Sequence, residues 1–242
     1  MLKLLRSLML GVLLIGAFVL ALLMCLLRPF HRNNVYQVAN WFGKVGPLLG
    51  LKVVKRGQEN LMKEQAVVYI GNHQNSYDLF TQSSLVPPGT VSLGKKSLIW
   101  IPLFGQIYWL TGNILIDRGN RSKAISTIQD AARKIREKAL SVWIFPEGTR
   151  SRGRGLLPFK TGAFHTAISA GVPIVPVLAS CQKDICMNKK DNGVVIVEAM
   201  EPIPTEGLSK EDVRALAQKV YDMMNRRLAE LNAEAAQLAA AK

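Results

Sequence analysis

Cysteine, acidic residues and aromatic residues are all scarce in this sequence of 242 residues. Three cysteines, none of them in a Cys-x-x-Cys pair, exclude a disulfide-stapled secreted scaffold and give no sign of a zinc site. Only 17 Asp and Glu stand against 31 Lys and Arg, so the net charge is +14. This excess requires an anionic partner: nucleic acid, a membrane surface or a phosphorylated substrate. Aromatic residues make up only 7% of the chain and no docking motif for nucleic acid is evident, which argues against the first.

A long apolar stretch without charge predicts a membrane-inserted helix near the N-terminus. Residues 7–27 contain 21 consecutive uncharged, mostly apolar residues, which as a helix would span about 30 Å, the thickness of a hydrocarbon core. A signal peptide is the alternative, but its apolar region is normally about 7–15 residues long and no cleavage site follows here. Basic residues flank both ends, so the positive-inside rule gives no strong orientation. A hairpin dipping in from one side is slightly favoured over a full span.

A second apolar stretch, from Val35 to Leu51, carries Trp41 and Phe42 and is interrupted by glycine and proline. That pattern indicates an interfacial helix rather than a second span. No acidic residue precedes Glu59, so the whole leader suits an anionic lipid surface. We therefore predict a membrane-anchoring helical leader over residues 1–50.

The remaining residues, 51–242, are predicted to form one α/β domain. Hydrophobic residues make up 49% of the chain, which is enough for a sizeable core and excludes disorder. Short β-rich runs alternate with helical patterns, and such alternation predicts a mostly parallel sheet covered by helices. The expected strands are Ala66–Ile70, Thr90–Leu93, Asn113–Ile116, Ser141–Phe145, Ile174–Ala179 and Val194–Glu198.

Two serines are predicted to start helices. Ser122 precedes apolar residues at steps of three and four, and Ser209 precedes Glu211 and Asp212 and a long apolar stripe. Both are therefore expected as N-caps.

Four short segments carry the candidate chemistry, and the first is Gly71–Asp78, directly after an apolar strand. His73 can take a proton near neutral pH, and the Asp78 carboxylate can fix its tautomer if the two meet at a strand-to-helix turn. The alternative is a helix-capping loop with an incidental histidine, and spacing alone does not decide between them.

The second and third segments are rich in positive charge. Gly112–Arg118 ends in Asp117 and Arg118, where a guanidinium could grip a phosphate or simply form a surface ion pair. Phe145–Ser151 follows another apolar strand, and residues 118–160 hold 11 basic and 3 acidic residues, a net of +8. Glycines let the backbone approach a ligand and arginines supply countercharge, although a solvated flexible loop is the plainer interpretation.

The fourth segment, Val172–Val177, places two prolines in an apolar strand. Proline cannot donate a ladder hydrogen bond, so an edge strand or a bulge is expected. This segment could line an acyl channel, or it could simply pack in the core.

In this order and spacing, the four segments resemble the glycerolipid acyltransferase family, whose hallmark is Asn-His-x4-Asp followed by Phe-Pro-Glu-Gly-Thr-Arg-Ser. Residues 95–102 and 151–164 are similar to the bacterial 1-acylglycerol-3-phosphate acyltransferase branch of that family. The resemblance covers roughly residues 51–201 and shows no departure from the hallmark residues.

The resemblance implies a direct acyl transfer to the sn-2 hydroxyl of 1-acyl-sn-glycerol 3-phosphate (lysophosphatidic acid) from acyl-CoA or acyl carrier protein, giving phosphatidic acid. His73 would be the general base and Asp78 would orient it; Ser76, between them, is the rival nucleophile, but the family gives it no such role. The residues that match the family's binding site for the glycerol phosphate are Arg118, Glu147, Gly148, Thr149 and Arg150, with Lys95 or Lys96 as additional countercharge. Because like charges repel, Glu147 is expected to position Arg150 or a glycerol hydroxyl rather than to bind phosphate.

A thioester is already activated, so neither a metal nor another cofactor is expected, and no His/Cys/carboxylate cluster has ligand spacing. The resemblance places the chain at the bacterial inner membrane with its site on the cytoplasmic face, in contact with membrane lipids and without nucleic acid. Two alternatives stay open: an acyltransferase for another acceptor, such as glycerol 3-phosphate or another lysolipid, and a membrane-tethered binder of anionic ligands without catalysis.

Overall fold

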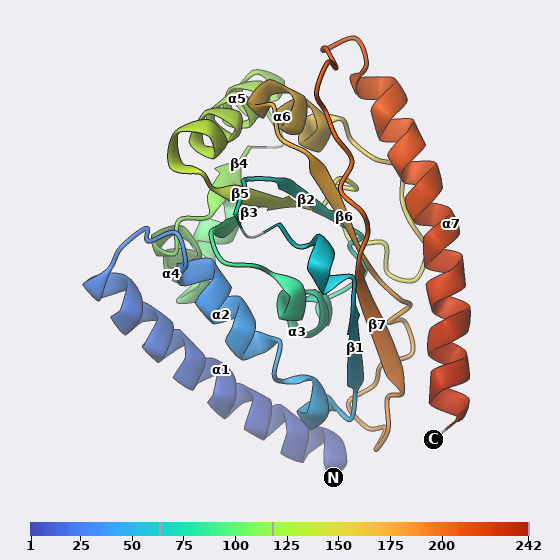
Figure 1. Ribbon diagram of the computed structural model, residues 1–242. Helices are drawn as coiled ribbons and strands as arrows, with labels where there is room; N and C mark the ends of the chain where they lie inside the picture. Colours follow the sequence, from blue (N-terminus) through green and yellow to red (C-terminus); the bar gives the residue numbers. More distant parts are fainter. Residues whose placement is uncertain (63, 118, 242) are drawn as a thin grey trace.

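The computed structural model describes residues 1–62, 64–117 and 119–241, and its core is one seven-stranded sheet (Figure 1). The strands follow the order β1-β7-β6-β2-β5-β3-β4. Their bounds are β1 Lys52–Arg56, β2 Val68–Gly71, β3 Thr90–Lys95, β4 Ile114–Ile116, β5 Ser141–Ile144, β6 Ile174–Ala179 and β7 Val194–Ala199. The six predicted strands are confirmed, whereas β1 is an addition.

The sheet is mostly parallel, as predicted. Strands β6, β2, β5, β3 and β4 all run in one direction, while β7 is antiparallel to β6 and pairs in parallel with β1. Because parallel strands end at the same edge, the segments that follow β2, β5, β3 and β4 all leave the sheet on one side.

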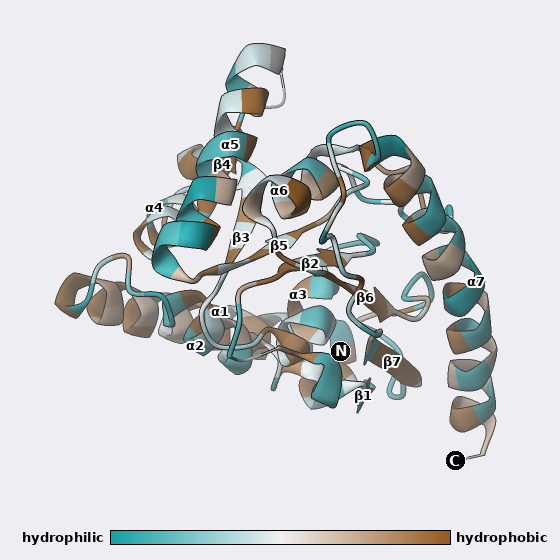
Figure 2. Cartoon of the chain, turned by 45° about the horizontal axis from the view of Figure 1, so that its top comes forward, coloured by the Kyte–Doolittle hydropathy of each residue, from teal (hydrophilic) through white to brown (hydrophobic). Residues whose placement is uncertain are grey.

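Helices cover both faces of the sheet because its strands alternate side chains between two cores (Figure 2). Val68 and Ile70 of β2 face one core, which is covered by α5 (Arg121–Lys138), α6 (Gly162–Ala170) and α7 (Val213–Ala240). Tyr69 faces the other core, which receives residues from α2 (Asn34–Phe42), α3 (Asp78–Thr81) and the 3-10 helices η1 (Gly46–Leu49) and η3 (Gln82–Leu85). The inner strands β2, β5 and β6 are therefore buried along their whole length, as is typical of parallel strands covered on both faces.

The N-terminal helix α1, Leu2–Leu27, packs against the second core through residues 10–18. Ala21 and Cys25 are fully buried, and Leu10 and Leu14 pack against the core at helical spacing. At the N-terminal end the Arg6 guanidinium, which is 6% exposed, donates to backbone carbonyls of the loop between β6 and β7. Near the other end, the Phe18 ring meets the Phe104 ring of α4 (Phe104–Leu110) edge to face, 6.4 Å apart.

The predicted leader shares its core with the sheet. Phe42 of α2 and Leu49 of η1 are buried together with Tyr69 and Trp143 of the strands. The second apolar stretch forms α2 and η1 rather than one interfacial helix, and its apolar side chains face the domain. The domain boundary at residue 50 stays a prediction.

Neither predicted serine cap is the N-cap of its helix. The N-cap of α5 is Asn120, whose Oδ1 accepts from the Lys123 N–H at 3.0 Å. The N-cap of α7 is Asp212, and the Ser209 N–H and hydroxyl both donate to its carboxylate at 2.8 Å. In each case the residue that can accept nearby backbone donors lies a few positions from the predicted serine.

The strand with two prolines was predicted to be an edge strand or to contain a bulge, but it is an interior strand whose register with β2 is unbroken. β6 lies between β7 and β2. Pro176 lies one residue before the first β6–β7 pair, Val177 with Ala199, and its carbonyl accepts from the Met200 N–H at 2.8 Å. Proline is tolerated there because the β7 ladder ends beside it.

Candidate active site

The candidate site lies at the carboxyl edge of the parallel strands. The turn that carries His73 follows β2, the loop that carries Glu147 follows β5, and Lys95 ends β3. Because β2, β5 and β3 are neighbours in the sheet, segments far apart in the sequence meet at this edge. Ligands of parallel α/β sheets bind at such an edge.

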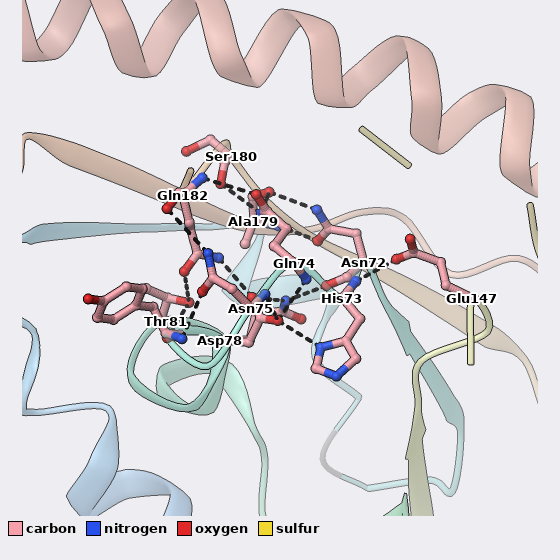
Figure 3. A network of polar contacts seen from close by, with 12 residues as sticks. Asn72, His73, Gln74, Asn75, Asp78, Thr81, Glu147, Ala179, Ser180 and Gln182 are labelled. Atoms are coloured by element: carbon pink, nitrogen blue, oxygen red, sulfur yellow. Dashed lines mark hydrogen bonds and ion pairs between the residues drawn. The ribbon is translucent and has the colours of Figure 1, made fainter. Parts of the chain in front are cut away.

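His73 and Asp78 meet in the turn between β2 and α3, with Nδ1 and Oδ2 2.7 Å apart (Figure 3). Asp78 is 5% exposed, and the same Oδ2 accepts the backbone N–H groups of Gln74 at 2.8 Å and Asn75 at 3.1 Å. A short aspartate side chain that accepts N–H groups three and four residues earlier closes the turn locally. The Asn-His-x4-Asp spacing thus places the carboxylate on the imidazole.

The imidazole of His73 is held from a second side by Phe145. The two rings are stacked, with centroids 4.2 Å apart and an interplanar angle of 18°. The histidine side chain remains 21% exposed. With Nδ1 engaged by Asp78, Nε2 is the nitrogen left to accept a proton, an assignment that follows from the hydrogen-bond network.

Glu147 is turned into the protein rather than toward substrate. The side chain is 3% exposed; Oε1 accepts the backbone N–H of His73 at 2.5 Å and Oε2 accepts that of Leu157 at 2.9 Å. Burial raises the pKa of Glu147 to about 7, and the two N–H donors offset only part of that effect. The contacts that the structure gives this carboxylate are therefore not the expected ones to Arg150 or a glycerol hydroxyl. Through them, Glu147 joins the loop after β5 to the backbone of His73.

The two hallmark loops are paired along their backbones. The Ser151 N–H donates to the His73 carbonyl at 2.7 Å, and the Arg152 N–H donates to the Gln74 carbonyl at 3.0 Å. Gly148 has φ +69°, a left-handed conformation that favours glycine, and its N–H closes a turn onto Phe145.

The next two predicted phosphate ligands lie on the exposed side of this loop. Thr149 and Arg150 are both exposed, and they lie between Glu147 and Ser151, which both bond to the His73 backbone. A phosphate bound by this turn would therefore lie close to the histidine.

The remaining residues predicted to supply countercharge are Lys95, Lys96 and Arg118. Lys95 and Lys96 are exposed at the end of β3, on the same edge of the sheet but separated from β2 by β5. Arg118 lies outside the described residues, so its predicted role stays a prediction.

Sequence reasoning missed a buried amide network behind the histidine turn. Gln182, 1% exposed, donates from Nε2 to Oδ1 of Asp78 at 2.9 Å. Gln74 donates from its own Nε2 to the carbonyls of Ala179 and Ser180, at 2.8 and 2.9 Å. The signal for Gln74 was its place between His73 and Asp78; for Gln182 no sequence signal exists, because it lies in the loop after β6.

Among the described residues, no group of three or more His, Cys, Asp or Glu side chains could hold a metal ion. The expectation of a reaction without metal or cofactor stays a prediction.

Exposed apolar side chains gather on α1 and around α4, and these two helices pack against each other. In the described part of the chain, α1 is the one helix long and apolar enough to cross a membrane. Its outward face is apolar and exposed, at Leu4, Leu8, Val12, Ile15, Val19 and Leu23. Exposed aromatic and aliphatic side chains around α4 extend that surface, at Trp100, Ile101, Leu103 and Trp109. Residues of this kind on the outside of a protein indicate contact with a membrane or another apolar partner.

The assembled site pairs an oriented imidazole with a basic, glycine-containing loop, in a protein that exposes an apolar surface. This arrangement can remove a proton from a hydroxyl group held by an anionic anchor. The same geometry suits a lipid acceptor with a charged head.

Comparison with known proteins agrees with this geometry. The acyltransferase family matches residues 52–180. The chain is 54% identical over 237 residues to the 1-acyl-sn-glycerol-3-phosphate acyltransferase of Haemophilus influenzae, covering 98% of this chain and 99% of that protein. It is 50% identical over 218 residues to the protein of that name from Escherichia coli, covering 90% and 89%.

The fold is also similar to the crystal structure of a 1-acyl-sn-glycerophosphate acyltransferase from Thermotoga maritima. The TM-score is 0.74 at 24% identity, over 96% of this chain and 95% of that one. With a family match over more than half of its length and relatives of this identity along nearly all of it, this chain belongs to the acyltransferase family.

Proposed function

We propose that this protein transfers a fatty acyl group from an acyl thioester to the sn-2 hydroxyl of 1-acyl-sn-glycerol 3-phosphate, producing phosphatidic acid for phospholipid synthesis. The names of the relatives supply the reaction. The observation that carries the proposal is the His73–Asp78 pair, in which Nδ1 and Oδ2 are 2.7 Å apart. The backbone of His73 is hydrogen-bonded to the basic loop after β5.

His73 acts as the general base. Asp78 accepts the Nδ1–H, so Nε2 carries the lone pair that takes the proton of the sn-2 hydroxyl as its oxygen attacks the thioester carbonyl. A C–O bond forms, the C–S bond breaks, and the imidazolium returns the proton to the leaving thiolate. Base catalysis of this kind contributes about 10²–10⁴-fold, and correct positioning supplies much of the rest.

The acceptor phosphate is bound by the loop after β5. The exposed Thr149 and Arg150 side chains, with Gly148, supply donors and countercharge, and Arg118 adds a second guanidinium. Lys95 and Lys96 contribute long-range attraction for the phosphate or for the acidic acyl donor, either acyl-CoA or acyl carrier protein.

Helix α1 lies within one leaflet instead of crossing the bilayer. A helix of 26 residues is about 39 Å long, and its Arg6 end and its Cys25 end both pack on the same domain. A transmembrane orientation would therefore pull the charged domain into lipid, whereas an in-plane orientation buries the apolar face and leaves the domain in water. The protein would then work at the cytoplasmic face of the bacterial inner membrane, where the lipid acceptor and the soluble donor meet.

A competition assay tests this function. The purified full chain in phospholipid nanodiscs is given one acyl thioester and equal amounts of lysophosphatidic acid, glycerol 3-phosphate and lysophosphatidylcholine. We expect phosphatidic acid as the dominant product. Acylation of glycerol 3-phosphate or of the lysophosphatidylcholine in its place would reject the assigned acceptor, and no acyl product would reject the activity.

A further inference from the structure

Asp78 uses its two carboxylate oxygens for different partners. Oδ2 accepts the imidazole Nδ1 and two backbone N–H groups, whereas Oδ1 points into the protein (Figure 3). The near donor to Oδ1 is Nε2 of Gln182, at 2.9 Å, while the amide of Gln82 is 3.4 Å away and donates at 2.6 Å to the Asn72 carbonyl. The orientation of the carboxylate therefore depends on a residue outside the two hallmark motifs.

The Gln182 amide can face in only one direction. Because a carboxylate oxygen can only accept, Nε2 must face Oδ1 of Asp78, and Oε1 then faces the Thr81 hydroxyl at 3.3 Å, which also lies 3.2 Å from the Tyr77 carbonyl. The side chain is 1% exposed, so water does not compete for these contacts. A buried amide with both ends engaged holds its partner more rigidly than a solvated one.

The backbone of Gln182 is anchored independently of its side chain. Its N–H donates to Oε1 of Gln74 at 3.0 Å, and its carbonyl accepts Nδ2 of Asn75 at 3.3 Å. Neither contact uses the side chain of residue 182, so both remain available when methionine or glutamate replaces the glutamine.

We propose that Gln182 is a positioning residue of the acyl transfer: its side-chain amide fixes Asp78, and through Asp78 it fixes the imidazole of His73. This inference rests on the proposed function of the same site. Gln182 lies beyond residues 52–180, which carry the family match.

Two substitutions separate positioning from simple packing. Gln182→Met keeps the length of the side chain and removes the donor, so Oδ1 of Asp78 loses its near partner. Gln182→Glu restores a donor only while the new carboxyl is protonated; once ionised, it repels Asp78. The titratable side chains that face Asp78 are His73 of the same turn and Glu147 of the loop after β5, and neither is altered.

Gln218→Met is the matched control. Gln218 lies exposed on α7, where its Nε2 donates to Asp222 at 2.9 Å, so the same amide-to-carboxylate bond is removed away from the site.

The experiment measures kcat and acceptor KM for the four full-length proteins in nanodiscs from pH 6 to 9. We expect Gln182→Met to lower kcat about tenfold with KM within about twofold, since a hydrogen bond to a charged group is removed. Gln182→Glu should lose activity relative to wild type progressively as the pH rises, and Gln218→Met should match wild type.

The inference is overturned if Gln182→Met keeps the wild-type kcat, if only KM changes, or if Gln182→Glu follows the wild-type pH profile. Gln182→Met could fail to fold, as judged by its thermal transition. In that case the test rests on the activity of Gln182→Glu relative to wild type as a function of pH. A wild type that acylates another acceptor overturns the proposed function instead, and the same comparison is then made with that acceptor.

Discussion

Replacing Glu147 with glutamine should change how the stability of the protein depends on pH. The carboxylate is 3% exposed, and its oxygens accept the backbone N–H groups of His73 and Leu157. Burial raises its pKa from 4.5 to about 7. Glutamine has nearly the same shape and does not titrate.

The size of the effect follows from the two pKa values of Glu147. A difference of 2.5, from 4.5 to about 7, corresponds to roughly 3 kcal/mol at about 1.4 kcal/mol per pH unit. Because the folded-state pKa is the higher one, the folded protein retains a proton that the unfolded chain releases. The stability that this retained proton contributes is fully present below pH 4.5 and is lost as the pH rises through 7.

Urea denaturation in detergent micelles at pH 4.5 and pH 8 measures this effect. From the lower to the higher pH, wild type should lose roughly 3 kcal/mol of unfolding free energy relative to Glu147→Gln. Glutamine offers one acceptor to two N–H donors, which costs about 1–3 kcal/mol, but this offset does not vary with pH. Glu201→Gln, which removes an exposed carboxylate, controls for the loss of one negative charge. If the free energies of unfolding of wild type and Glu147→Gln differ by the same amount at both pH values, the reasoning is refuted.

Three further predictions concern the acceptor, the N-terminal helix and the membrane. Arg150→Ala should raise the KM for lysophosphatidic acid about tenfold with little change in kcat, because a charged anchor is lost; steady-state kinetics with an unchanged KM would contradict phosphate binding there. Arg6→Met should lower the free energy of unfolding by about 1–3 kcal/mol, because backbone carbonyls of the β6–β7 loop lose their donor; an unshifted urea midpoint would contradict this. Val12→Glu combined with Leu20→Glu, on the exposed face of α1, should reduce co-sedimentation with anionic vesicles at least about tenfold, and undiminished binding would mean that this face does not contact lipid.

The sheet was largely predictable because buried parallel strands are continuous apolar runs. β1 was not predicted because it lies at the edge of the sheet and three of its five residues are charged: Lys52, Lys55 and Arg56. It therefore lacks the continuous apolar run of a buried strand. The interior position of β6 was missed because Pro176 argued for an edge, and only the point where β7 leaves the ladder explains the proline.

In the site, local geometry was predictable and long-range geometry was not. His73 and Asp78 are five residues apart in one turn, so their contact was one of two open interpretations of the spacing, and the family resemblance favoured it. The inward orientation of Glu147 depends on two loops that are 74 residues apart in sequence, and the Gln182–Asp78 bond joins residues 104 apart. Such contacts follow from the order of strands in the sheet, which the sequence alone did not reveal.

The most direct measurement is the single-turnover rate of acyl transfer to lysophosphatidic acid by wild type and His73→Ala in the same nanodiscs. If the imidazole takes the hydroxyl proton, the variant should be slower by at least about 10²-fold while its unfolding transition is retained. A folded His73→Ala protein that keeps more than about a tenth of the wild-type rate, far above what loss of a general base allows, would contradict this mechanism.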